Sequence, residues 1–81
     1  METQRNVIRI LNVLSNREDI QESDSLSSDL HLDSLEMVML LVYLEDELQL
    51  ELKESDMNPY DLQTVKDVVD LAQRYLEERN E

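Results

Sequence analysis

The sequence of 81 residues contains no cysteine and no glycine. Without cysteine, the chain forms no disulfide bond and has no thiol chemistry of its own. Without glycine, it has neither the glycine-rich loops that bind phosphates in nucleotide-binding folds nor the turn glycine of a calcium-binding loop. No apolar run approaches the length of a membrane span, and residues 1–5 do not resemble a secretion signal. We therefore expect a cytoplasmic protein with no membrane segment.

Basic residues are also scarce. Seven Lys and Arg residues stand against 20 Asp and Glu residues, which gives a formal net charge of −13 at pH 7. A surface this negative repels nucleic acids and anionic lipid head groups, so we expect neither as a partner. It should instead be steered toward basic patches on other proteins. The length predicts one small monomeric domain over residues 1–81, with a core at about 3–76 and a charged, fraying tail at 77–81.

Three stretches carry apolar residues at the three- and four-residue steps of a helix, so the sequence predicts an all-α fold. The first covers residues 3–14 and the second covers residues 34–48. The last begins at Thr64, where Asp67, three residues later, forms an approximate capping box. One short helical turn is expected at about residues 56–60. Together these elements predict a small four-helix bundle made of three main helices and a short third one.

The connection over residues 15–33 is long for a compact domain, and its Ser and Asp residues discourage a continuous helix. A calcium loop starting at Asp19 or Asp24 would place a leucine where the bidentate glutamate belongs, so we reject calcium binding. Residues 49–53 alternate in polarity, but no second strand is available for pairing, and we expect an extended connection there. Four apolar residues of the long loop are spaced to pin it onto the bundle: Ile20, Leu26, Leu30 and Leu32.

The second helix is rich in apolar residues, so we predict which of them face the core. Branched aliphatic residues are expected to face the core at these positions: Leu35, Val38, Leu41, Val42 and Leu48. The other residues include the exposed ones: Glu36, Met37, Met39, Leu40, Tyr43, Glu45, Asp46 and Glu47. Because the aliphatic residues already fill the core positions, we expect at least one of the two methionines to be an exposed contact for a partner.

Ser34 lies where the loop meets this helix. An isolated serine in this place would be interpreted as a helix cap, and Asp33 is an equally good capping residue. However, Asp33-Ser34-Leu35 closely resembles the phosphopantetheine attachment motif of the acyl carrier protein family. The length, acidity and helix order of nearly the whole chain are similar to that family as well. The motif is flanked by apolar residues that belong to the same pattern: Leu30, Leu32 and Val38.

The resemblance implies a carrier that performs no catalysis. A separate phosphopantetheinyl transferase would move 4'-phosphopantetheine from coenzyme A to the Ser34 hydroxyl, and acyl groups would then be carried as thioesters on the thiol of this arm. Asp33 is expected to orient the serine and to help the magnesium site of the transferase, with Leu35 beside it. The other implied partners are acyl or aminoacyl ligases, acyltransferases and synthase enzymes that have basic patches.

The resemblance also implies a docking surface and a shelter for the acyl chain. Leu35, Val38 and Leu62 are the expected lining of a pocket for a short acyl chain. By the resemblance, Glu36, Glu45 and Asp46 are expected to bind basic residues of partners, and Met37 and Met39 are added to this surface as the candidate methionine contacts described above.

Two residues depart from the family pattern. Met39 occupies a position that is usually acidic in bacterial fatty-acid carriers, and His31 replaces the usual glycine before the motif. A polyketide or other specialised pathway therefore fits better than primary fatty-acid synthesis. An aminoacyl or peptidyl carrier, or an unmodified acidic adaptor protein, remains an alternative. We expect His31 to be a surface residue without a catalytic role, because a triad with Ser34 would need an acid converging on both at a loop–helix junction.

Overall fold

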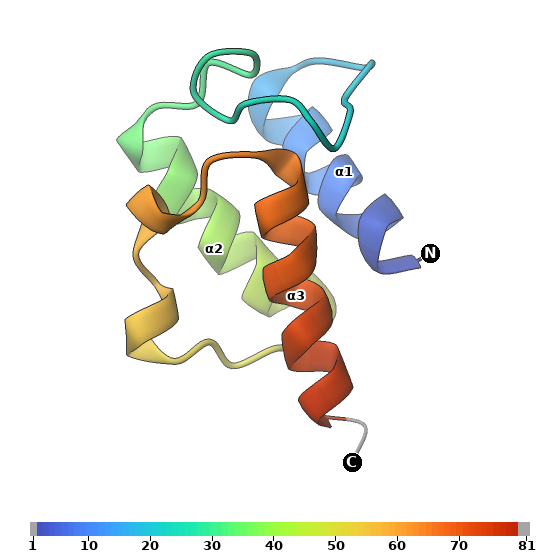
Figure 1. Cartoon of the computed structure of the whole chain (residues 1–81), viewed down its shortest axis with the longest axis vertical. Coiled ribbons are helices and arrows are strands. Elements are labelled where there is room, and N and C mark those ends of the chain that lie inside the picture. Colours follow the sequence, from blue (N-terminus) through green and yellow to red (C-terminus); the bar gives the residue numbers. More distant parts are fainter. Residues whose placement is uncertain (1, 80–81) are drawn as a thin grey trace.

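The computed structural model describes residues 2–79 and consists of three α-helices joined by two long connections (Figure 1). Helices α1, α2 and α3 cover Glu2–Ser15, Ser34–Leu48 and Val65–Arg79. Figure 1 shows the helices packed against one another, with the loop between α1 and α2 covering one end of the bundle. Within residues 2–79 no strand is formed, and the only β-pairing is an isolated bridge between Ser25 and Thr64. The predicted all-α fold is therefore confirmed.

Helix α1 extends one residue beyond the predicted range at each end. Its inward stripe buries Val7, Ile10 and Leu11 completely or nearly so. Asn16 ends the helix in the left-handed region, at φ 59°, and its N–H donates to the carbonyl oxygen of Asn12 at 2.8 Å. The helix therefore ends through a local backbone turn that asparagine tolerates better than most residues do.

The long loop is fixed to the bundle by the four apolar residues that the sequence singled out. Their exposed fractions are low: Ile20 7%, Leu26 1%, Leu30 3% and Leu32 6%. Backbone hydrogen bonds join the loop to the start of α3, from the N–H of Leu26 to Gln63 at 2.9 Å and from the N–H of Val65 to Asp24 at 3.0 Å. Because both its side chains and its backbone are bound to the bundle, the loop has a fixed position beside the start of α2.

The connection between α2 and α3 contains two single turns of 3₁₀-helix, η1 over Glu54–Asp56 and η2 over Pro59–Asp61, in place of one short helix at 56–60. Residues 50–53 form no regular secondary structure and no strand, and Leu50 and Leu52 are buried there. Proline begins the second turn, where its fixed φ suits a helical start and its missing N–H costs nothing.

Tyr75 ties this connection to α3. Its hydroxyl accepts a hydrogen bond from the backbone N–H of Lys53 at 3.0 Å and donates one to the carboxylate of Asp56. Arg74 also pairs with Asp56, at 3.1 Å. The Tyr75 hydroxyl and the Arg74 guanidinium hold the pKa of Asp56 below its usual range. Burial and the bond to Asp56 raise the pKa of Tyr75.

Helix α3 begins with the predicted capping box. The Asp67 carboxylate accepts from the N–H groups of Gln63 and Thr64 at 3.0 and 3.1 Å, and the Thr64 hydroxyl accepts from Asp67 at 3.3 Å. These donors hold the pKa of Asp67 below its usual range. The helix continues through Arg79, beyond the residue 77 at which we expected fraying, and residues 80 and 81 lie outside the described residues.

Helix α2 has the predicted bounds but a different orientation. Leu35, Val38 and Val42 were expected in the core, yet 68%, 45% and 49% of their respective surfaces are exposed. The prediction of the core face is therefore wrong at these three positions. Apolar residues surround most of this helix, so the spacing alone allows more than one inward face, and packing against α1 and the loops selects one of them. The buried stripe consists of Met37, Leu40, Leu41, Leu44 and Leu48.

Candidate functional site

Ser34 is the first residue of α2 and its side chain is exposed. Asp33 caps the helix in an extended conformation, and its Oδ1 accepts from the N–H of Glu36 at 2.8 Å. In return, Oε1 of Glu36 accepts from the N–H of Asp33 at 3.1 Å. This reciprocal capping box fixes the backbone on both sides of Ser34, so the hydroxyl is presented in a defined direction.

The first turn of α2 also leaves donors free beside Ser34. The N–H of Glu36 is bound by Asp33, and the N–H of Met37 donates to the carbonyl oxygen of Asp33 at 2.9 Å. Among the described residues, the N–H groups of Ser34 and Leu35 have no hydrogen-bond partner. Two unpaired donors at the positive end of the helix dipole favour a negatively charged group at this position.

A cavity of about 400 Å³ opens directly beside Ser34. Three segments form it: the loop at residues 25–27, residues 32–37 at the start of α2, and residues 60–63 from η2 onward. Leu62 lines this cavity, as expected, but Val38 and Leu35 do not. Val38 follows Met37 by one residue and therefore points about 100° away from it around the helix. The complete lining is Ser25, Leu26, Ser27, Leu32, Asp33, Ser34, Met37, Tyr60, Leu62 and Gln63.

The methionines expected at the partner surface lie in different surroundings. Met37 is only 9% exposed and lines the cavity, so it is not available as a surface contact. Met39 is half-buried and remains a candidate for one.

The predicted acidic residues are also unequal. Glu36 belongs to the capping box, and Oε2 of Glu45 accepts from the N–H of Leu52 at 3.0 Å, which holds the chain after α2. Asp46 is exposed, and its backbone carbonyl accepts from the Gln49 side chain at 2.9 Å. Charge changes at Glu36 and Glu45 would therefore disturb local structure, whereas Asp46 carries its charge at the surface.

Helix α2 carries an exposed apolar stripe that was not predicted from the sequence. Leu35, Val38 and Val42 follow one another along the outward side of the helix and begin next to Ser34. The signal that could have revealed this stripe is the excess of apolar residues, since one face of a single helix cannot bury all of them.

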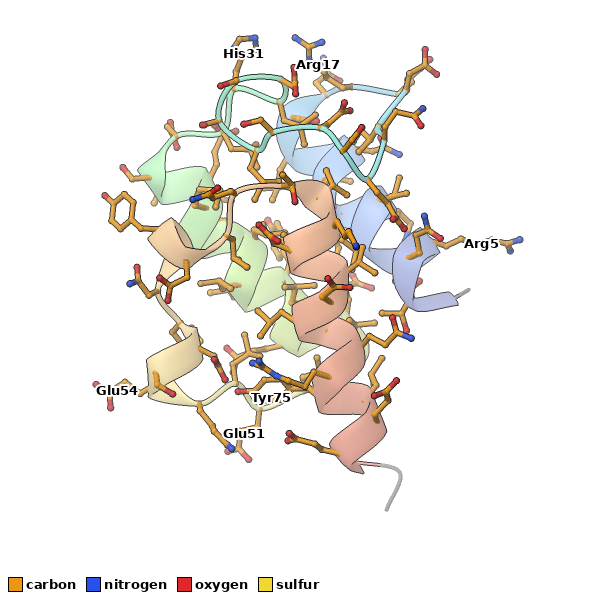
Figure 2. The ribbon with its side chains drawn as sticks, in the orientation of Figure 1. Arg5, Arg17, His31, Glu51, Glu54 and Tyr75 are labelled. Atoms are coloured by element: carbon orange, nitrogen blue, oxygen red, sulfur yellow. The ribbon has the colours of Figure 1, made fainter. Side chains whose placement is uncertain are left out.

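His31 lies in the loop before the site, with φ at 56°. Figure 2 shows its side chain directed outward at the end of the molecule. Among the described residues, no group of three or more His, Cys, Asp and Glu side chains could hold a metal ion. None of the described helices is long and apolar enough to cross a membrane.

The site thus consists of an exposed serine at the start of α2, next to unpaired N–H groups and a cavity. Residues 4–72 match the family described as phosphopantetheine attachment site. An acyl carrier protein of Chlamydia muridarum is 39% identical over 62 residues, which are 76% of this chain and 73% of that protein. The chain therefore belongs to the acyl carrier protein family, whose prosthetic group is 4'-phosphopantetheine.

The fold is similar to that of a solved relative. The crystal structure of an acyl carrier protein from Thermotoga maritima matches with a TM-score of 0.76 over 96% of this chain and 94% of that chain, at 24% sequence identity. Membership of the family implies interaction with a phosphopantetheinyl transferase and with biosynthetic enzymes.

Proposed function

We propose that Ser34 is the attachment site and that the chain carries acyl groups as thioesters on its 4'-phosphopantetheine arm. The observation that carries this proposal is an exposed serine at the first position of α2, next to two unpaired N–H groups and a cavity. The Asp33-Ser34-Leu35 motif lies inside the matched range of residues 4–72. The chain itself supplies no catalysis in this proposal, and it acts in the cytoplasm.

The residues around Ser34 suit the phosphate of this group. Its negative charge would lie at the N-terminus of α2, where the free N–H groups of Ser34 and Leu35 favour an anion. When bound, the group supplies a terminal thiol, which the chain itself lacks and on which acyl groups are held as thioesters. Asp33 uses Oδ1 for the helix cap, and its other oxygen would face the metal ion of the transferase.

The cavity is suited to shelter a short acyl chain. Its apolar wall consists of Leu26, Leu32, Met37 and Leu62. Its volume of about 400 Å³ lies at the lower end of the range for small-molecule sites. We assign the acyl pocket to these residues, which include the predicted Leu62 and have Met37 in place of Val38.

The outward side of α2 is the proposed docking surface for enzymes of the pathway. Leu35, Val38 and Val42 offer apolar contact area, and Asp46 adds negative charge near the end of the helix. Basic patches would be drawn to this surface by the net charge of −13. Met39, half-buried at the edge of the stripe, replaces a usual acidic residue, which supports a polyketide or other specialised pathway.

The test is intact mass after incubation with coenzyme A, magnesium and a broad-specificity phosphopantetheinyl transferase. We expect the native chain to gain one phosphopantetheine and Ser34→Ala to gain none. Ser27→Ala is the matched control, because Ser27 is also exposed and lines the same cavity, and it should be modified like the native chain. No gain on a folded and unmodified native chain would make Ser34 a plain helix residue and favour the acidic adaptor.

A further inference from the structure

Helix α1 and the residues just after it differ in charge from the remainder of the chain. Residues 3–17 contain three of the seven basic residues, Arg5, Arg9 and Arg17, and none of the 20 acidic residues. Of the 20 acidic residues, 18 lie between residues 18 and 78. A net negative protein thus has one basic segment, and its position in the fold decides what that segment can contact.

Two of these basic residues lie on one exposed side of α1, and the third lies just beyond its end. Arg5, Arg9 and Val13 follow at four-residue spacing, which places them on one side of α1, and all three are exposed. Arg17 is also exposed, just beyond the end of the helix. We call these four residues the α1 ridge. Figure 2 shows Arg5 and Arg17 directed away from the bundle, with Glu51 and Glu54 at the other end of the molecule.

The α1 ridge includes an apolar residue that the fold does not use. Val13 is 73% exposed, the second highest value among the large hydrophobic residues described, although the neighbouring Ile10 is buried. A hollow of about 180 Å³ lies beside it, between α1 and α2. Its lining is Arg9, Ile10, Val13, Tyr43 and Glu47. The hollow offers a place for one apolar side chain of another molecule.

The cations of the ridge are largely uncompensated. Arg9 pairs with Glu47 at 3.8 Å, but both side chains are about half or more exposed, at 66% and 49%, so the pair is weak. Arg5 and Arg17 form no ion pair with any side chain that the structure describes. The ridge therefore presents positive charge to solvent on both sides of Val13.

We propose that the α1 ridge docks a second protein through an acidic surface patch that carries an apolar side chain, which enters the hollow beside Val13. Charge complementarity selects this occupant, since Arg5, Arg9 and Arg17 attract acidic groups. A compact acidic patch can contact the ridge alone. An anionic membrane or a nucleic acid extends further and would also meet the acidic remainder of the chain. This surface goes beyond the proposed carrier function and does not depend on an arm at Ser34.

The experiment follows the amide chemical shifts of isotope-labelled protein by NMR while a helical peptide is added. The peptide has 14 residues, the same length as α1, with Glu at every fourth position and one Leu between them. We expect saturable amide shifts at the α1 ridge and at Tyr43. Arg5→Glu combined with Arg9→Glu should weaken binding about tenfold, because two attractive contacts become repulsive. Val13→Ser should weaken it by a smaller factor, since apolar contact is lost without a change in charge.

The matched control combines Lys53→Glu with Lys66→Glu, which changes the net charge equally at exposed cations away from the ridge. It should bind like the native chain. Equal weakening by the control, shifts spread over the whole chain, or equal binding of a peptide with Lys in place of Glu would overturn the proposal. So would ridge-dependent binding to vesicles with anionic lipids, which would make a membrane the occupant. Attachment at Ser34, measured on the same samples, reports separately on the carrier function.

Discussion

Among residues 2–79, three adopt a left-handed backbone, and the sequence has no glycine that could take their place. Asn16, His31 and Gln49 have φ values of 59°, 56° and 54°. A residue with a Cβ pays roughly 1–2 kcal/mol for this conformation, and asparagine pays less than most because its side chain bonds locally. His31 therefore stores strain two residues before Asp33, where the loop leads into α2.

Replacing His31 with glycine should stabilise the fold. We expect His31→Gly to raise the free energy of unfolding by about 0.5–1 kcal/mol, or the melting temperature by about 2–8 °C, since part of the relieved strain is offset by the greater freedom of glycine in the unfolded chain. Asn16→Gly is the control and should gain less. Calorimetry measures both, and a lower melting temperature for His31→Gly would show that its side chain has a stabilising contact.

Removal of the Tyr75 hydroxyl should lower the stability of the fold. Tyr75→Phe loses the bonds to the Lys53 N–H and to the Asp56 carboxylate, and should destabilise the protein by roughly 1–3 kcal/mol at neutral pH. Tyr43→Phe is the matched control, because no hydrogen bond of the Tyr43 hydroxyl is found among the described residues. Urea unfolding of the two variants gives the comparison.

The cost of Tyr75→Phe should depend on pH. The pKa of Asp56 is lowered in the folded state, chiefly by the Tyr75 hydroxyl, so the ionised carboxylate stabilises the fold above its unfolded pKa of about 4. This contribution is lost as the pH falls through the lower, folded pKa. The gap between the native chain and Tyr75→Phe should therefore be largest at neutral pH and shrink in acid. A gap that widens in acid would contradict this role for Asp56.

Among the helices, α2 shows most clearly what could and could not be predicted from the sequence. Its bounds follow from Asp33 at the start and from the end of the apolar pattern, and both were predicted correctly. The capping box of α3 was predicted for the same reason, because a cap depends only on residues close in sequence. The inward face of α2 depends on α1 and the loops, and local spacing cannot supply that information.

The same distinction explains the candidate site. Ser34 and Asp33 were singled out by a local motif, and the structure presents the serine at the surface. The cavity beside it combines residues from loops far apart in sequence, such as Ser27 and Gln63. Of the residues expected to line the pocket, only Leu62 does so. Val38 does not, because the orientation of α2 turns its side chain toward solvent.

A pair of truncations tests the orientation of α2. Leu40 is fully buried and Leu35 is 68% exposed. Leu40→Ala should cost roughly 2–5 kcal/mol through lost burial and a cavity, whereas Leu35→Ala should change stability by less than about 0.5 kcal/mol. Chemical unfolding of both variants measures the difference. If Leu35→Ala costs as much as Leu40→Ala, the inward face is the one that the spacing alone favoured.

The net charge of −13 acts on the whole molecule. The chain measures 35 × 26 × 19 Å, and at about 0.01 M salt the Debye length of about 30 Å spans most of that size. Acidic groups on opposite sides then repel one another, and this repulsion favours the expanded unfolded chain. At about 0.15 M salt the Debye length falls to about 8 Å, so only near neighbours still interact.

Moderate NaCl should therefore raise the melting temperature at pH 7, and a fall would contradict self-repulsion as a destabilising force. The effect should nearly vanish near the isoelectric point of about 4.2, where the net charge is close to zero.

The same salt should slow attachment of phosphopantetheine at Ser34, because screening weakens the attraction of basic enzyme surfaces. A control with Asp46→Asn, which removes surface charge from α2, should show a smaller loss of rate. Opposite responses of stability and docking to one variable would identify both as effects of the acidic surface.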